Sequence, residues 1–231
     1  MLRMRYLIEQ LFLNKRAISR WLIFFLAGMI IIDLIAMLAD CIQIKLYYLS
    51  LHGTEITRRM LIENEFRQNR VGLAQLGFLF MTAIFFLLWL YHAYKNLRLF
   101  KIEDTSFSPQ WAVLSYFIPG LNFYLPYQSM CELWQASHST ALSRNEWKKV
   151  AVPRFILGWW LLFVIAMMVE LFSWKIILKG ETIHELSIHG AIWFVSNLFE
   201  IIAIVLLISV VRRINLQQRE KFRRLSALEN K

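Results

Sequence analysis

Three acidic residues lie inside long apolar runs, where a carboxyl group is energetically costly and therefore informative. Asp33 follows WLIFFLAGMIII, Glu170 lies within AMMVELF, and Glu200 lies within SNLFEII. Ionisable side chains at membrane depth usually face the interior of a helix bundle or a water-filled path, where they serve ion and proton movement. Asn197 lies one helical turn before Glu200, on the same face. Two interpretations remain open at this point: a proton- or cation-coupled path, and interhelical hydrogen bonds that fix packing.

A second set of polar residues follows the second long apolar run and continues on a later helix-forming segment. Within each group the spacing is three or four residues, so the side chains share neighbouring faces of a helix. We expect Glu132 of the later segment to pair with Lys95 or Arg98 and so to clamp the two segments together. A polar pocket for a ligand headgroup or a substrate is the alternative. The residues of this candidate clamp or pocket are His92, Lys95, Asn96, Arg98, Gln128 and Glu132.

Motifs of enzymatic chemistry are not found in the sequence. It contains no P-loop, no G-x-S-x-G and no H-E-x-x-H. His184 and His189 are five residues apart, a poor spacing for zinc on one helix, and the two cysteines, Cys41 and Cys131, are distant in sequence. We therefore expect no enzymatic activity, no catalytic residue, no cofactor and no metal site.

The composition points to a bilayer as the environment of these residues. The 231-residue chain is 58% hydrophobic and only 18% charged, whereas a soluble domain is about half apolar and a quarter charged. A helix needs about 20 mostly apolar residues to cross the hydrocarbon layer. Four segments satisfy this, which predicts an all-α, polytopic integral membrane protein with four transmembrane helices in one domain, 21–211. The predicted spans are 21–39, 71–94, 155–174 and 191–211, preceded by a basic amphipathic helix, 1–20, and followed by a basic tail, 212–231.

A fifth apolar stretch, WAVLSYFIPGLNFYLPYQSM, raises the question of whether it crosses the membrane. Its first eight residues would form only about 12 Å of helix, and Pro119-Gly120 is a strong turn signal. Asn122 can satisfy backbone groups of such a turn, and Pro126 suits the first turn of a new helix. We predict a re-entrant or interfacial helical hairpin, 111–139, between the second and third spans.

The basic residues agree with this interpretation. With four crossings, nineteen of the 26 lysines and arginines fall on one side, which the positive-inside rule assigns to the cytoplasm. A fifth crossing would place the basic tail and the cluster at 144–154 outside. The sequence therefore predicts that both termini are cytoplasmic.

Four blocks in order resemble a known family: WLYHAYKNLRLF (89–100), FSPQWAV (107–113), FIPGLNFYLPYQSM (117–130) and ELWQAS (132–137). Together they resemble the bacterial membrane proteins grouped as domain of unknown function 4328 (DUF4328). One departure is Leu114-Ser115-Tyr116, where a run rich in Gly and Trp is expected. The resemblance implies a multi-span bacterial membrane protein and no particular reaction.

Function is predicted only as a class. The net charge of +10 is dispersed in short groups, which favours topology signals and anionic lipid headgroups as partners over nucleic acid. A protein partner or a homo-oligomer also remains open. We expect a multi-pass protein of the bacterial inner (cytoplasmic) membrane that acts as a non-enzymatic scaffold or accessory subunit. The alternative is a small transporter, channel or lipid-binding protein that uses the buried acids and the broken hairpin.

Overall fold

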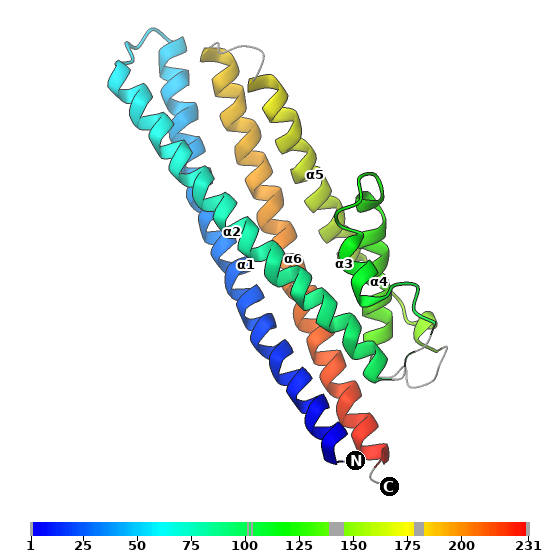
Figure 1. The fold of residues 1–231 in the computed structure, drawn as a ribbon. Helices are drawn as coiled ribbons and strands as arrows, with labels where there is room; N and C mark the ends of the chain where they lie inside the picture. Colours follow the sequence, from blue (N-terminus) through cyan, green and yellow to red (C-terminus); the bar gives the residue numbers. More distant parts are fainter. Residues whose placement is uncertain (1, 101, 103, 139–145, 178–182, 230–231) are drawn as a thin grey trace. The chain divides into compact units, whose positions relative to one another are not determined.

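A computed structural model describes residues 2–100, 102, 104–138, 146–177 and 183–229. All regular structure in these ranges is helical, as predicted, and no strand occurs in them. Figure 1 shows the helices in chain order. They are α1 (Leu2–Leu51), α2 (Arg58–Leu99), α3 (Pro109–Leu114), η1 (Leu121–Phe123), α4 (Leu125–Ser137), η2 (Glu146–Lys149), α5 (Arg154–Ile177) and α6 (Ile183–Glu229).

Four of these helices are long and apolar enough to cross a membrane, the number predicted from the sequence. Each candidate span contains or nearly contains the predicted segment. Three of the long helices extend well beyond it, since α1 begins at Leu2, α2 begins at Arg58, and α6 continues through the basic tail to Glu229. The candidate spans are Ala17–Leu51, Arg58–Leu99, Arg154–Ser173 and Ser187–Arg224.

The chain forms two compact units, and each of the four long helices contributes to both. Unit 1 comprises Met1–Phe24, Thr82–Gly158 and Leu206–Lys231, and therefore holds α3, η1, α4 and η2. Unit 2 comprises Phe25–Met81 and Trp159–Val205.

In unit 2 several polar side chains are buried among apolar ones, while large apolar side chains lie on the outside. The buried stripe of α1 repeats every three or four residues, the spacing of one helix face, and it includes Asp33 and Asp40, which are 0% and 2% exposed. The opposite faces are apolar: Ile31 and Leu38 are 59% and 65% exposed. Apolar side chains outward and polar side chains inward suit a lipid surrounding.

Close packing and defined helix ends set the register of α1 and α2 in unit 2. A Cβ at Gly28 would overlap the ring of Phe78, so the absence of a side chain there lets α1 approach α2. After α1 the chain turns at Gly53, whose φ of +83° favours glycine.

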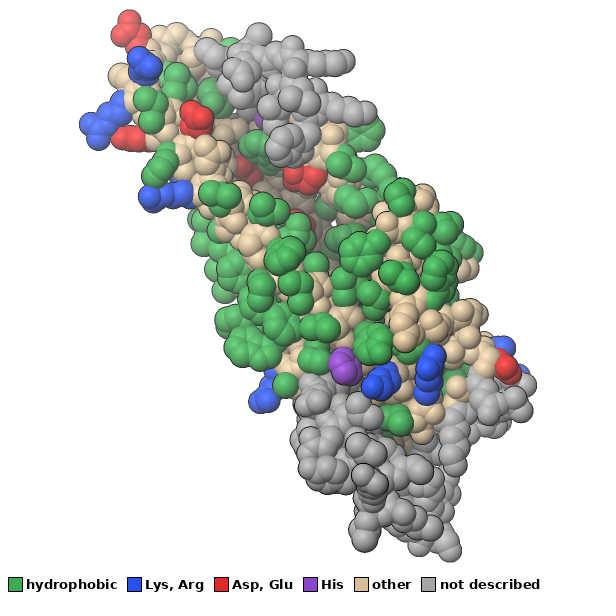
Figure 2. All heavy atoms as spheres, viewed as in Figure 1, with side chains coloured by type: hydrophobic (Ala, Val, Ile, Leu, Met, Phe, Trp, Pro, Cys, Tyr) green, Lys and Arg blue, Asp and Glu red, His purple; other side chains and the backbone are tan. Residues whose placement is uncertain are grey.

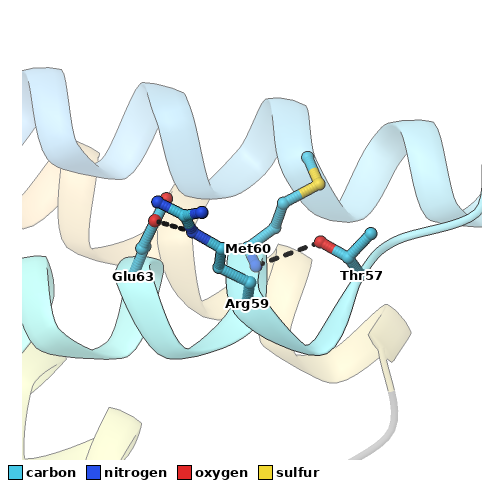
Figure 3. A network of polar contacts seen from close by, with 4 residues as sticks. All are labelled: Thr57, Arg59, Met60 and Glu63. Atoms are coloured by element: carbon cyan, nitrogen blue, oxygen red, sulfur yellow. Dashed lines mark hydrogen bonds and ion pairs between the residues drawn. The ribbon is translucent and has the colours of Figure 1, made fainter.

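Thr57 then caps α2, because its Oγ1 accepts a hydrogen bond from the backbone N–H of Met60 at 3.3 Å (Figure 3). Beside the cap, Arg59 and Glu63 form an exposed i,i+4 ion pair of 2.8 Å. Exposed pairs of this kind contribute little to stability. The cap, rather than the ion pair, therefore defines where α2 begins.

Unit 1 contains two helices, α3 and α4, separated by a turn that includes η1, in the region of the predicted hairpin. Ser108 caps α3 by accepting from the N–H of Trp111 at 3.1 Å, directly before Pro109 in the first turn. The turn passes through Gly120 at a φ of +80°, and Pro126 lies in the first turn of α4. The second helix ends at Ser137, two residues earlier than predicted.

Candidate functional site

A chain of carboxyl and amide side chains links α1, α2 and α6 within unit 2. Gln75 of α2 donates to Oδ1 of Asp33 at 3.1 Å and to Oδ1 of Asn197 at 2.9 Å. Asn197 donates to Oδ2 of Asp40 at 3.1 Å, and Gln68 donates to Oδ1 of Asp40 at 3.3 Å. These five residues are called the acid–amide chain below.

Helical spacing explains why these side chains meet. Asp33 and Asp40 are seven residues apart on α1, and Gln68 and Gln75 are seven apart on α2. Seven residues are two helical turns, about 10 Å, so both members of each pair lie on one face. Since Asp40 pairs with Gln68 and Asp33 with Gln75, the two helices run antiparallel in register.

The same register continues one turn further along both helices. The amide of Asn64 donates to Gln43 at 3.2 Å, and both side chains are buried. Arg67 donates to Asn64 at 2.5 Å from the same helix. The polar interface between α1 and α2 therefore covers at least three successive layers.

Glu170 of α5 and Glu200 of α6 lie close enough to interact electrostatically with this chain. Glu200 interacts with Asp33 and Glu170, and Glu170 interacts with Asp40. Both glutamates are half-buried, in contrast to Asp33. Figure 2 shows acidic side chains in a recess among hydrophobic side chains in its upper half. The structure thus brings the three predicted acids together and adds Asp40, which the sequence analysis did not single out.

Glu132 occupies the centre of the second candidate site, in unit 1, but its partners differ from those expected. Its carboxylate accepts the backbone N–H of Ser106 at 2.6 Å and of Phe107 at 3.2 Å, and the hydroxyl of Tyr94 at 3.4 Å. No ion pair joins it to Lys95 or Arg98 in the described ranges, so that part of the prediction is wrong. Both basic side chains are more exposed than Glu132, which is 7% exposed. Glu132 therefore holds the linker before α3, not the basic face of α2.

A stripe on α6, spaced by three residues, carries contacts that the sequence analysis missed. Asn215 accepts from the indole N–H of Trp89 at 3.0 Å and donates to Ser19 at 2.6 Å. Gln218 and Lys221 follow on the same face, and both are almost fully buried. The sequence analysis assigned this region to a basic tail, because its lysines and arginines obscure the polar stripe.

Two residues of this stripe hold the end of α4. Gln218 donates to the hydroxyl of Ser137 at 2.8 Å and accepts from Asn96 at 3.1 Å. The ammonium of Lys221 donates to the carbonyl of Ala136 at 2.9 Å. A cation at a helix C-terminus offsets the negative end of the helix dipole. Asn96 is thus the predicted site residue that joins α2 to α6, through Gln218, which in turn contacts α4.

The remaining predicted residues lie apart from one another. His92 is half-buried and contacts the ring of Tyr91 edge to face at a centroid distance of 5.6 Å. Gln128 donates to the hydroxyl of Tyr124 at 2.5 Å, one turn earlier on the chain. Pro119 is exposed at the turn. Asn122 does not hold the turn as expected, because its Oδ1 is buried with no hydrogen-bond partner in the described part of the chain.

An open cleft of about 710 Å³ lies between the linker, α3, α4 and η2 of unit 1. Gln128 and Glu132 contribute to its lining, so two predicted residues share it. Cys131 also lines it, and burial raises the pKa of this thiol. Other polar and aromatic residues of the lining include Phe107, Trp111, Tyr124, Tyr127, Trp147 and Lys148.

Of the two histidines singled out near the start of α6, only His189 has a described side chain. His189 is buried against Trp193 at a centroid distance of 5.9 Å, and the side chain of His184 lies outside the described residues. Within the described ranges, no group of three or more His, Cys, Asp or Glu side chains is placed to hold a metal ion.

Four long apolar helices with outward-facing hydrophobic side chains and a polar interior define the class: an all-α membrane protein. The chain belongs to the family Domain of unknown function (DUF4328), whose sequence profile matches residues 53–216. This match extends the resemblance of 89–137 across all of α2, α3, α4 and α5 and most of α6. Neither the curated proteins nor the solved structures include a match to this chain.

Proposed function

We propose that this chain is a small membrane transport protein that conducts protons along the acid–amide chain of unit 2. The observation that carries the proposal is the unbroken contact from Asp33 through Gln75 and Asn197 to Asp40, with every donor–acceptor distance at or below 3.1 Å. A proton relay requires hydrogen-bonded neighbours and groups that gain and lose protons. Carboxyl groups at both ends of the contact supply that chemistry. The amides between them do not titrate, and they hold the two carboxyl groups in position for proton transfer through water.

The pattern of donors favours a proton over a metal cation. Both oxygens of Asp40 and one oxygen of Asp33 already accept amide N–H groups. Oδ2 of Asp33 is buried with no hydrogen-bond partner in the described residues. A proton needs one such oxygen, whereas Mg²⁺ or Ca²⁺ needs six or more oxygen ligands.

The interior acids also favour transport over a scaffold, the first of the two expected classes. An acidic residue near the centre of a transmembrane helix costs about 2.5–3.5 kcal/mol on the insertion scale. The interior group of unit 2 comprises four acids, Asp33, Asp40, Glu170 and Glu200, and an apolar residue at any of these positions would remove that cost. Neutral amides such as Gln75 and Asn197 can supply the interhelical hydrogen bonds that a scaffold needs, whereas proton transport needs groups that gain and lose protons.

We also propose the location predicted from the sequence: the inner membrane of a bacterium, with both termini in the cytoplasm and the hairpin at that face. The side chains of the hairpin support contact with lipid, because Leu114, Phe117 and Tyr124 are 51%, 65% and 58% exposed. The proposed activity involves no bond-breaking reaction and no cofactor.

Proton flux in proteoliposomes tests the function. The purified chain is reconstituted with a pH-sensitive dye inside, and a potential is imposed with valinomycin and potassium. We expect flux from the wild type, loss of flux to the level of protein-free vesicles in Asp33→Asn, and wild-type flux in Glu63→Gln, an exposed acid of the same unit. Equal flux in wild-type and Asp33→Asn vesicles would contradict the proposal, and flux absent from all three would leave the scaffold as the better account.

A further inference from the structure

The cleft of unit 1 contains a buried donor that lacks an acceptor. Trp147 of η2 lines the cleft and is only 3% exposed. Its indole N–H has no hydrogen-bond partner in the described part of the chain. Buried donors in folded proteins are nearly always paired, so an unpaired one is a candidate contact for a ligand that supplies the acceptor.

A cation lies beside this donor. The ammonium of Lys148 is 5.4 Å from the centroid of the Trp147 ring, and Lys148 also lines the cleft. No ion pair to Lys148 is found in the residues described. The acidic group in the lining, Glu132, is directed to the backbone N–H groups of Ser106 and Phe107. The cleft therefore offers a positive charge and an N–H donor together, the combination that binds an anionic oxygen.

The rest of the lining suits the boundary between headgroups and acyl chains. Trp111, Tyr124 and Tyr127 line the cleft, and such aromatic residues are enriched at membrane–water interfaces. Phe117 and Leu121 extend the surface along the hairpin and are 65% and 46% exposed. The volume of about 710 Å³ is within the range of small-molecule sites.

We propose that this cleft binds the phosphate of a phospholipid, with its acyl chains along the exposed apolar side chains of the hairpin. The phosphate oxygens accept from the indole N–H of Trp147 and from the ammonium of Lys148. This lipid site lies in unit 1 and does not depend on proton conduction in unit 2.

Binding of short-chain lipids to the full chain in detergent tests the site. The probe is dioctanoyl phosphatidylglycerol, and bound lipid is counted by native mass spectrometry over a concentration series. Dioctanoylglycerol keeps the acyl chains without the phosphate, and glycerol 3-phosphate keeps the phosphate without the chains. We expect each of these partial ligands to bind at least about tenfold more weakly than the complete lipid.

Three variants locate the binding to the cleft. Trp147→Phe keeps an aromatic ring but removes the indole N–H donor. Lys148→Glu reverses the charge of the side chain. Each variant should weaken phosphatidylglycerol binding by about tenfold or more. Lys149→Glu makes the same charge change at the next residue, which does not line the cleft, and should change binding by less than about threefold. Thermal unfolding of each variant confirms that it is folded.

Three results would overturn the lipid site. Binding of dioctanoylglycerol as tight as that of the phospholipid would show that the phosphate is not recognised. Equal binding of glycerol 3-phosphate would identify a site for soluble phosphates. Equal losses in Lys148→Glu and Lys149→Glu would show general surface electrostatics, not a defined site.

Discussion

Replacement of Glu132 by glutamine should release the linker that precedes α3. The carboxylate of Glu132 is 7% exposed and accepts the N–H groups of Ser106 and Phe107 at 2.6 and 3.2 Å. Glutamine has nearly the same shape, but it carries one acceptor oxygen and an NH₂ group. In Glu132→Gln, one of the two backbone donors therefore faces another donor.

The size of the effect follows from these two contacts. A hydrogen bond to a charged group contributes about 1.5–3 kcal/mol. The variant loses one such bond and weakens the other to a neutral bond, so we expect the linker to be destabilised by about 3 kcal/mol. That corresponds to a change of about two orders of magnitude in the local opening equilibrium.

Amide hydrogen exchange of the detergent-solubilised protein measures this change directly. The amides of Ser106 and Phe107 should exchange about 100-fold faster in Glu132→Gln than in the wild type. The control is Gln128→Ala, one turn earlier on α4, whose partner Tyr124 is exposed; it should leave both amides protected. The double variant Glu132→Arg with Arg98→Glu should fail to restore protection, because Arg98 is not the partner. Unchanged exchange in Glu132→Gln, or restoration by the charge swap, would refute this reasoning.

Three further predictions concern packing, the end of α4 and the thiol of the cleft. Gly28→Val should lower the free energy of unfolding by about 1–3 kcal/mol because the site is already filled, whereas Gly77→Val, with open space around it, should not; thermal melts compare the two. Lys221→Met leaves a buried carbonyl unpaired and should destabilise the protein by about 1–3 kcal/mol, and an equal effect of Arg219→Met on an exposed position would contradict that explanation. Because burial raises the pKa of Cys131, less thiolate forms near neutral pH. Iodoacetamide should therefore alkylate Cys131 more slowly in the folded than in the unfolded protein, with the difference shrinking as pH rises, and equal rates at pH 7 would count against its burial.

The features that the sequence could predict are those that depend on local pattern. The lengths of the apolar runs predicted the four long helices. The turn at Pro119-Gly120 and the helix start near Pro126 follow from restrictions on φ and on backbone donors. Asp33 could be singled out because a carboxyl group is conspicuous in an apolar run.

Features that depend on register between helices could not be predicted in the same way. Asp40 and Gln68 lie near or beyond the ends of the predicted spans, and only the alignment of α1 with α2 brings them together. The sequence feature that could have identified them is their seven-residue spacing from Asp33 and Gln75. That spacing predicts a contact only when α1 and α2 are known to be antiparallel.

Glu132 and Lys221 were misjudged for a related reason. The carboxylate of Glu132 accepts hydrogen bonds from backbone N–H groups. Such partners cannot be predicted from the pattern of charged side chains. Lys221 lies in a run of basic residues that is interpreted from the sequence as a topology signal. Nothing in that run distinguishes the one lysine whose buried ammonium donates to a backbone carbonyl. In both cases the partner belongs to the backbone, so side-chain types alone did not identify it.

The central claim, that protons move along the acid–amide chain, is tested most directly at its bridging residue. Gln75 contacts both Asp33 and Asn197 and carries no charge, so Gln75→Leu interrupts the chain and leaves every acid in place. Proton flux into proteoliposomes should fall to the rate of protein-free vesicles in Gln75→Leu and remain at the wild-type rate in Gln135→Leu, the same substitution in unit 1. Wild-type flux in folded, reconstituted Gln75→Leu would contradict the account.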